Sequence, residues 1–312
     1  MVSETTQQTI SNLPETQFYQ WQEYRCAYEV WSSPDSDVQK TPLLLIHPIG
    51  VGLSRRFWDR FCQQWMMANQ ENAIYNPDLL GCGESDMPQQ AYRSEFWAEQ
   101  LQHFIQTIIQ KPVIIVVQGA LFPVAISLFQ TIDPDLIKGM ILAGPPAWKI
   151  MTTSTENWKQ QLTWKILSSP AGTAFYRYAR RRKFLRSFSD RQLFAETEAV
   201  DHQWLDTLEA GATDLNSRYA VFSFLAGFWR KDYAIDMANL NVPVLVVIGE
   251  QASSISRTGK GEPPEQRLGD YLQHLPQGQG MELSGRNVLP YESTSTFVTA
   301  ITPFARQVET VL

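Results

Sequence analysis

The residues best placed to do chemistry lie in the stretch VIIVVQGALFPVAISLF, which runs from residue 113 to residue 129. Five apolar residues lead into a turn of small residues, and an apolar run typical of a helix follows. Many enzymes place a nucleophilic serine at such a sharp turn between a strand and a helix. The centre of this turn is Gly119, which has no side chain to attack a carbonyl. The next serine, Ser127, comes about two helical turns later and is not expected at the tip.

Other residue types that support catalysis or metal binding are few and scattered. The three cysteines match no metal-site spacing, so they are expected to be reduced thiols in the cytoplasm. The four histidines, His47, His103, His202 and His274, lie far apart in the sequence and form no pattern of metal ligands. The sequence therefore predicts neither a metal ion nor a cofactor.

The elements around the turn alternate between strands and helices. Apolar runs at residues 41–48, 112–117 and 136–144 are typical of buried strands, whereas residues 53–67 and 93–110 have the apolar spacing of helices. This alternation predicts an α/β fold with three layers, in which helices cover both faces of a mostly parallel, twisted sheet.

The alternation is interrupted once, and the interruption divides the chain. Only helical patterns occur between residues 147 and 237, and the next strand pattern is VPVLVVIGE at 242–250. We interpret 147–237 as a helical cap inserted into a core whose two halves are 17–146 and 238–312. Residues 1–16 are polar and are expected to form a flexible N-terminus.

The amino-acid composition is typical of a globular protein and argues against several other classes of protein. The chain has 312 residues, of which 44% are hydrophobic and 19% charged, as in ordinary globular proteins. Its net charge of −6 argues against nucleic-acid binding. The N-terminus lacks the apolar core of a signal peptide, and no apolar run approaches the ~18 residues that a membrane helix needs. We expect a cytoplasmic protein, either free or peripheral to a membrane.

The motifs and their order resemble the α/β-hydrolase superfamily. Residues 43–61 are similar to the strand and loop that supply one amide of the oxyanion hole. NPDLLGCGESDMP resembles the family's D-x-x-G-x-G-x-S turn, with Asp78, Gly81, Gly83 and Ser85 in place. Residues 242–253 resemble the strand before the catalytic acid, and residues 283–297 the loop of the catalytic histidine. The stretch HPIGVGLSRRFW is also similar to hydrolase-like proteins of cyanobacteria and chloroplasts.

The resemblance places Gly119 where the family has its nucleophile. The family's turn reads G-x-S-x-G, and aligning strand with strand puts Val117 and Leu121 at the two glycines. Glycine at the tip accepts a positive φ at no steric cost, whereas a serine there is strained. Val117 and Leu121 are expected to fill the space beneath the turn and to crowd it.

The other two catalytic positions also lack the required side chains. The family's acid follows three residues after the glycine that ends its strand, which leads from Gly249 to Ala252. Aligning the histidine loop through Glu292 and Phe297 places Asn287 at the histidine. Asparagine forms hydrogen bonds but cannot shuttle protons near neutral pH. The resemblance therefore implies a triad-less protein, with Gly119, Ala252 and Asn287 at the positions of nucleophile, acid and base.

A binding pocket is still implied near the turn. The backbone N–H groups of Ile49 and Ala120 occupy the family's oxyanion-hole positions. Phe122 stands where it would fill substrate volume, and His47 follows the strand next to the oxyanion loop. We predict Ile49, Ala120, Phe122 and His47 as ligand-binding residues, although a structural role is the simpler explanation for His47.

The cap contains one strongly basic stretch, FYRYARRRKFLRSF, at residues 175–188. Its cations are Arg177, Arg180, Arg181, Arg182, Lys183 and Arg186. One interpretation is a basic amphipathic helix that docks on an anionic membrane or an acidic partner protein. The other is a solvated helix whose apolar side packs on the core, which is the more general explanation because cap helices need such a face.

These observations predict a non-catalytic binding or scaffold protein with an α/β-hydrolase fold. Its partner is either another protein or a small apolar ligand held between core and cap. The alternative is an esterase-like hydrolase or a lyase with a non-standard active site between core and cap. A scaffold that binds the membrane periphery through the basic segment is a third interpretation, because a fold alone does not determine function.

Overall fold

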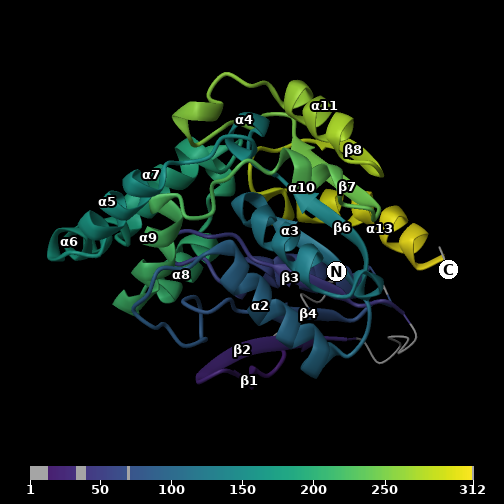
Figure 1. Ribbon diagram of the computed structural model, residues 1–312, viewed down its shortest axis with the longest axis horizontal. Coiled ribbons are helices and arrows are strands. Elements are labelled where there is room, and N and C mark those ends of the chain that lie inside the picture. The colour runs from purple at the N-terminus through teal and green to yellow at the C-terminus, as the bar shows by residue number, and fades with distance from the viewer. Residues whose placement is uncertain (1–12, 33–39, 69–70, 311–312) are drawn as a thin grey trace, which may run out of the picture.

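A single twisted sheet forms the centre of the protein (Figure 1), whose computed structural model describes residues 13–32, 40–68 and 71–310. The strand order is β1-β2-β4-β3-β5-β6-β7-β8, and β2 runs antiparallel to both of its neighbours while β3 to β8 are parallel. The strands are β1 Gln17–Trp21, β2 Tyr24–Trp31, β3 Leu43–Ile46, β4 Ile74–Pro77, β5 Val113–Gln118, β6 Ile137–Ala143, β7 Val244–Gly249 and β8 Gly278–Leu283. The predicted mostly parallel sheet is confirmed.

The central strands are apolar along their whole length because helices cover both faces of the sheet. In β5, Val113, Ile115 and Val117 pack toward one face, and Ile114 and Val116 pack toward the other. The first face is covered by α2 Ser94–Phe104, α3 Phe122–Thr131 and α11 Pro264–His274, and the second by α1 Asp59–Met67 and α13 Thr294–Thr310. The predicted three-layer α/β fold is therefore confirmed.

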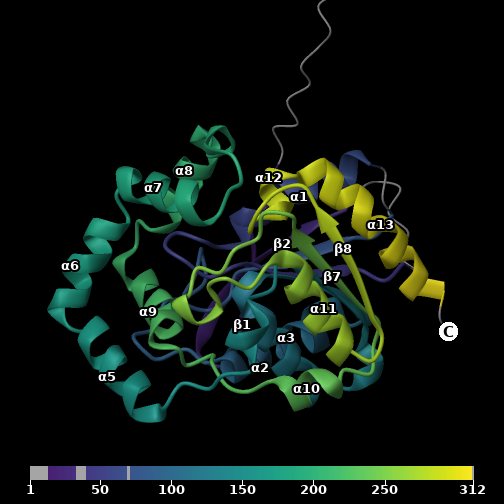
Figure 2. The ribbon, with the colours of Figure 1, turned by 90° about the horizontal axis from the view of Figure 1, so that it is seen from above.

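The segment predicted to be a cap lies between β6 and β7. Among its residues, 147–237, the structure contains helices and short turns but no strand. We call this segment the helical insertion. Its helices are α4 Trp148–Met151, α5 Asn157–Leu167, α6 Pro170–Ala179, α7 Arg182–Gln192, α8 His202–Gly211 and α9 Arg218–Ala226, and α10 Ala234–Ala238 follows at its end. Figure 2 shows α5, α6 and α7 along the outer rim of the molecule, with α9 between them and the sheet.

Two glycines allow the backbone of the insertion to pack directly against the backbone of the core. A Cβ atom added at Gly211, in the last turn of α8, would lie 2.2 Å from the carbonyl oxygen of Gly52. A Cβ added at Gly52 would lie 1.9 Å from the carbonyl oxygen of Leu208, and Gly52 has a φ of +77°. Because Gly52 belongs to the loop after β3, α8 is seated directly on the carboxyl edge of the sheet.

Short elements complete the chain. They are the 3-10 turns Arg55–Trp58, Gly119–Leu121, Pro134–Leu136, Thr197–Ala199, Leu215–Ser217 and Arg257–Gly259, the π-helical end of α2 at Ile105–Ile109, and α12 Leu289–Glu292. Most of the N-terminus predicted to be flexible, residues 1–12 of 1–16, lies outside the described residues. In the part of the chain that the structure describes, no helix is long and apolar enough to cross a membrane.

Candidate functional site

The turn after β5, residues 117–121, has the backbone geometry of a strand-to-helix elbow. Gly119 has a φ of +62°, in the left-handed region that glycine enters without steric cost, as the sequence predicts. A Cβ atom added there would have the carbonyl oxygen of Gly144 as its one neighbour within 4 Å, at 3.9 Å. Val117 and Leu121 are buried in the core. The prediction that they crowd the tip is wrong, because their side chains fill the interior beneath it.

Asn287 lies at the carboxyl edge of the sheet, in the loop after β8. Its side-chain amide donates hydrogen bonds to the carbonyl oxygens of Gln192, at 2.6 Å, and Ser253, at 3.0 Å. Its Oδ1 accepts a hydrogen bond from the backbone N–H of Ser253 at 3.3 Å. The backbone N–H of Asn287 donates to the carbonyl oxygen of Leu193 at 3.0 Å. Both amide hydrogens are therefore engaged, and two of these partners belong to the helical insertion.

The structure brings the three predicted catalytic positions into one neighbourhood. Gln118, directly before Gly119, donates from Nε2 to the carbonyl oxygen of Asn287 at 2.7 Å. Ala252 is buried, its N–H donates to the carbonyl oxygen of Gly249 at 2.8 Å, and the next residue, Ser253, holds the Asn287 side chain. The loops after β5, β7 and β8 therefore meet around Asn287.

Sequence reasoning did not identify three polar residues of this cluster: Gln118, Ser253 and Arg286. Arg286 donates to Ser253 Oγ from Nε, at 3.0 Å, and from Nη2, at 2.7 Å. Its Nη1 also reaches the carbonyl oxygen of Phe194 at 3.5 Å. Their sequence positions could have identified them, because each of the three is the immediate neighbour of a predicted catalytic position.

Two of the four predicted ligand-binding residues, His47 and Phe122, are fully buried and have partners within the protein. His47 is fully buried; its Nδ1–H donates to the carbonyl oxygen of Pro48 at 2.8 Å, and its Nε2 accepts from the N–H of Leu79 at 3.1 Å. Phe122 is also fully buried and packs against Tyr271 with ring centroids 6.2 Å apart. His47 therefore joins two loops and Phe122 packs in the core, and their part in ligand binding stays a prediction. Of the other two, Ile49 is buried and Ala120 is partly exposed beside Gly119.

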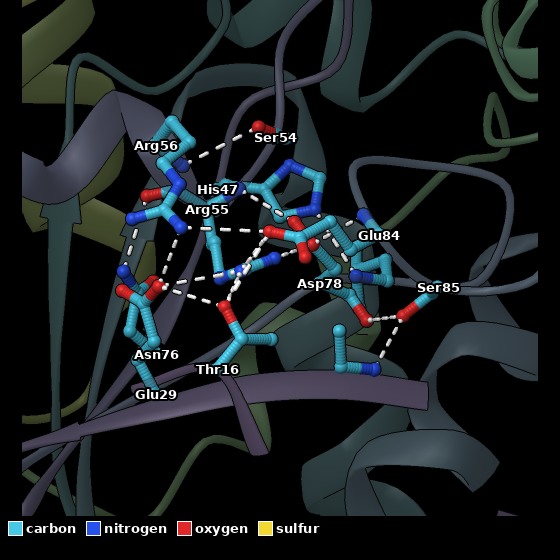
Figure 3. Close-up of polar contacts among 12 residues, drawn as sticks. Thr16, Glu29, His47, Ser54, Arg55, Arg56, Asn76, Asp78, Glu84 and Ser85 are labelled. Carbon is cyan, nitrogen blue, oxygen red and sulfur yellow. Dashed lines mark hydrogen bonds and ion pairs between the residues drawn. The ribbon is translucent and has the colours of Figure 1, made fainter. Parts of the chain in front are cut away.

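A buried network of charged groups lies at the same edge of the sheet, around the loop after β4 (Figure 3). Arg55 is fully buried and forms ion pairs with Asp78, Glu29 and Glu84. Asp78 accepts hydrogen bonds from the backbone N–H groups of Arg55 and Glu84, both at 2.8 Å. Ser85 Oγ donates to the carbonyl oxygen of Asp78 at 2.9 Å. These contacts fix the loop after β3 against the loop after β4.

A model of the alpha/beta hydrolase family matches residues 43–298. This chain belongs to the alpha/beta hydrolase family. A comparison with curated proteins gives no significant match.

Solved structures with the same fold include enzymes from several bacteria. An esterase from Thermogutta terrifontis is 19% identical, with a TM-score of 0.69 over 92% of this chain and 95% of that one. An enol-lactonase from Burkholderia xenovorans LB400 is 13% identical, with a TM-score of 0.69 over 93% and 100%. A bromoperoxidase from Bacillus anthracis is 15% identical, with a TM-score of 0.66 over 91% and 96%. At such low identities these likenesses show the fold alone.

Within this alpha/beta hydrolase fold, burial and charge shift several pKa values near the Arg55 network. Burial raises the pKa of Asp59 to about 7, against the opposing effect of the Arg56 guanidinium. Burial alone would raise the pKa of Glu84, but Arg55 and Arg56 hold it below its usual value. Burial lowers the pKa of His47, so the imidazole is neutral near pH 7.

The cysteines of this family member have the properties of inert thiols. Cys26, Cys62 and Cys82 are free and buried. Burial raises the pKa of each thiol, that of Cys26 to about 12, so no reactive thiolate forms near neutral pH. Among the residues that the structure describes, no three His, Cys, Asp or Glu side chains are grouped to hold a metal ion.

The basic segment divides into paired and unpaired cations. Arg182 forms ion pairs with Asp206 and Glu209 on α8. Arg180 donates from Nη1 to the carbonyl oxygens of Ala212 and Thr213, at 3.1 and 3.0 Å, and so caps the end of α8. The other four, Arg177, Arg181, Lys183 and Arg186, are exposed. Arg180 and Arg182 thus have partners inside the insertion, and the prediction that all six cations form a partner or membrane surface stays a prediction.

Proposed function

We propose that this member of the alpha/beta hydrolase family is a non-catalytic binding or scaffold protein that lacks the Ser–His–acid triad. The observation that carries the proposal is the state of Asn287, whose two amide hydrogens are bound by the carbonyl oxygens of Gln192 and Ser253. A general base must accept a proton from the nucleophile, and a neutral carboxamide does not do so. Gly119 offers no nucleophile, and the buried thiols offer no substitute.

The loop around Asn287 has a mechanical task instead. Asn287 holds Leu193 and Gln192, and Glu292 accepts a hydrogen bond from the N–H of Ala195 at 3.0 Å. Together with the contact of Arg286 at Phe194, these bonds attach the end of α7 to the carboxyl edge of the sheet. The residues of the catalytic positions therefore support a fixed arrangement of core and helical cap, which favours binding over turnover.

A small ligand is expected beside the elbow, under the cap. Ala120 is partly exposed there, and its N–H and that of Ile49 are the proposed donors to a polar group of the ligand. Gln118 Oε1 is buried and has no hydrogen-bond partner among the described residues, so a ligand that carries a donor would satisfy this acceptor once the side chain turns toward it. A partner protein recognised by the insertion is the other form of this proposal.

A second candidate function is a hydrolase or lyase with a non-standard active site between core and cap. The observation in its favour is that the elbow keeps its left-handed turn and leaves room for a side chain at Gly119. Such an enzyme would need a nucleophile or base from outside the three family positions.

Assays with p-nitrophenyl esters of several chain lengths and a fluorophosphonate serine probe distinguish a non-catalytic binding protein from a hydrolase. We expect no turnover above background and no labelling. The matched control is Gln118→Leu, which removes the polar group at the elbow but leaves Gly119 unchanged. Turnover that survives repurification and disappears in Gln118→Leu would show an active site at the elbow and would contradict the proposal. Native mass spectrometry of the same two proteins tests ligand retention, which Gln118→Leu is expected to reduce.

A further inference from the structure

The charges of the chain are strongly segregated. Between Asn157 and Ser189, a segment that spans α5, α6 and most of α7, lie eight of the 26 Lys and Arg residues and none of the 32 Asp and Glu residues. The rest of the chain carries 18 Lys and Arg against 32 Asp and Glu. An acidic protein therefore presents one basic region, and that region coincides with three consecutive helices.

Most of these cations are not neutralised within the protein. Lys159 pairs with Glu156 at 2.6 Å, and Arg182 pairs with α8. Five others, Lys165, Arg177, Arg181, Lys183 and Arg186, are exposed and form no ion pair with any residue that the structure describes. Their charge is therefore available to an external anionic surface.

Exposed apolar side chains concentrate on the same helices. Trp158, Leu162 and Ile166 recur every four residues along α5, and Phe175 and Tyr178 stand three apart on α6. Each is between 43% and 63% exposed, and together they are five of the eleven large exposed hydrophobic side chains among the described residues. A helix of a monomeric protein usually turns such residues toward the core, so this outward stripe indicates contact with another apolar phase.

Both views place these helices at the periphery. In Figure 1 α6 forms the end of the molecule farthest from β8 and α13, and in Figure 2 α5, α6 and α7 follow the outer rim. Lys159 lies 5.4 Å from the Trp158 ring centroid and Arg181 5.8 Å from that of Tyr178, so cations flank the exposed aromatic rings. Trp and Tyr next to Lys and Arg are typical of the boundary between lipid headgroups and acyl chains.

We propose that the face formed by α5, α6 and α7 docks on an anionic lipid bilayer. Trp158, Leu162, Ile166, Phe175 and Tyr178 would enter the headgroup region, while the five unpaired cations contact the lipid phosphates and carboxylates. Each Lys or Arg near such a surface strengthens partitioning by about fivefold. The acidic remainder of the chain is repelled, which orients this face toward the bilayer. The proposal is independent of the chemistry at Gly119 and Asn287.

Flotation of the purified full chain tests it. The probes are phosphatidylcholine vesicles with about 30 mol% phosphatidylserine, and vesicles of phosphatidylcholine alone. We expect the protein to float with the first and to bind at least about tenfold more weakly to the second or at high salt. Trp158→Gln/Leu162→Gln/Ile166→Gln and Lys165→Gln/Arg177→Gln/Lys183→Gln should each lose about tenfold or more of the binding.

Matched variants use equally exposed residues elsewhere. Leu225→Gln/Ile235→Gln/Ile255→Gln also removes three large exposed hydrophobic side chains, and Lys149→Gln/Arg257→Gln/Lys260→Gln removes the same charge. Both should bind vesicles as the unmodified protein does. The proposal is overturned if the protein does not float, or if the control variants lose as much binding as the test variants. It is also overturned if sedimentation shows self-association that the test variants abolish, since this face would then join copies of the chain.

Discussion

Two neighbouring loops at the carboxyl edge of one sheet differ sharply in their chemistry. The loop after β4 holds Asp78, whose carboxylate binds the buried Arg55 and two backbone N–H groups. The loop after β5 holds Gly119, which has no functional group. The neighbouring Gln118 has an Oε1 atom with no hydrogen-bond partner among the described residues. Charged groups are thus concentrated where they fix loops, while the turn at Gln118 and Gly119 carries none.

The difference teaches that the contacts that fix the loops at this edge do not involve the side chains at the elbow. The Arg55 network holds the loop after β3, and the glycine contact between Gly52 and Gly211 seats α8 on that same loop. These contacts serve the fold whether or not a reaction takes place. Under the proposed function, they hold the loops around the elbow in place without any need for turnover.

The largest effect is expected from breaking the charged loop. Arg55→Gln leaves the buried Asp78 without its cation, while Glu29 keeps its ion pair with Arg56, and it should lower the free energy of unfolding by about 3–5 kcal/mol. Urea unfolding measures it. Arg182→Gln is the matched control, because its ion pairs with Asp206 and Glu209 are exposed to solvent, and it should leave the midpoint nearly unchanged. Equal midpoints for both variants would show that the Arg55 network does not hold the fold.

A smaller effect is expected on the pH dependence of stability, through Asp59, which lies close to the same charged network. Its folded pKa of about 7 lies above the ordinary value of 3.8. Between these two pH values the folded state keeps a proton that the unfolded chain has lost, so stability falls as pH rises from about 4 to about 7. Asp59→Asn should remove this fall, worth on the order of 4 kcal/mol at about 1.4 kcal/mol per pKa unit. Thermal unfolding at pH 5 and pH 8 tests this, and parallel pH profiles would contradict it.

The sequence predicts the fold better than the site. The elements of the fold depend on residues close together in the sequence, whereas the site depends on contacts between residues far apart in the sequence. Apolar runs and turn residues act locally, so the strands, the helical insertion and the positive φ of Gly119 follow from short segments. The ion pairs of Arg182 with α8 and the bonds of Asn287 to Gln192 join residues that are distant in sequence. His47 shows the same limit, because its position beside the oxyanion loop does not reveal that both ring nitrogens are already bound.

Asn287→Ala tests whether the elbow neighbourhood attaches the insertion to the core. The change removes two donated hydrogen bonds and leaves the carbonyl groups of Gln192 and Ser253 without these donors. We expect a loss of about 1–3 kcal/mol and faster amide hydrogen exchange at residues 192–195. Asn216→Ala, on the exposed turn before α9, is the control and should leave exchange there unchanged. Unaltered protection in Asn287→Ala would mean that the insertion is held by other contacts.

The smallest effect is expected at the elbow itself. Gly119→Ser must adopt a φ near +62°, which costs about 1 kcal/mol or slightly more, and the open space around the added Cβ adds no clash. Gly119→Ala carries the same backbone strain without a hydroxyl, so melting curves of the two variants should coincide. Neither should hydrolyse esters, because Asn287 cannot take the serine proton.

Adding Ala252→Asp and Asn287→His to Gly119→Ser would supply all three side chains at positions whose loops already meet. Activity in this triple variant, but not in Gly119→Ser, would show that the family geometry survives and that only the reactive groups are missing. If Gly119→Ser alone hydrolyses esters while Gly119→Ala does not, a base outside position 287 activates the serine, and the contrast between the two loops no longer holds.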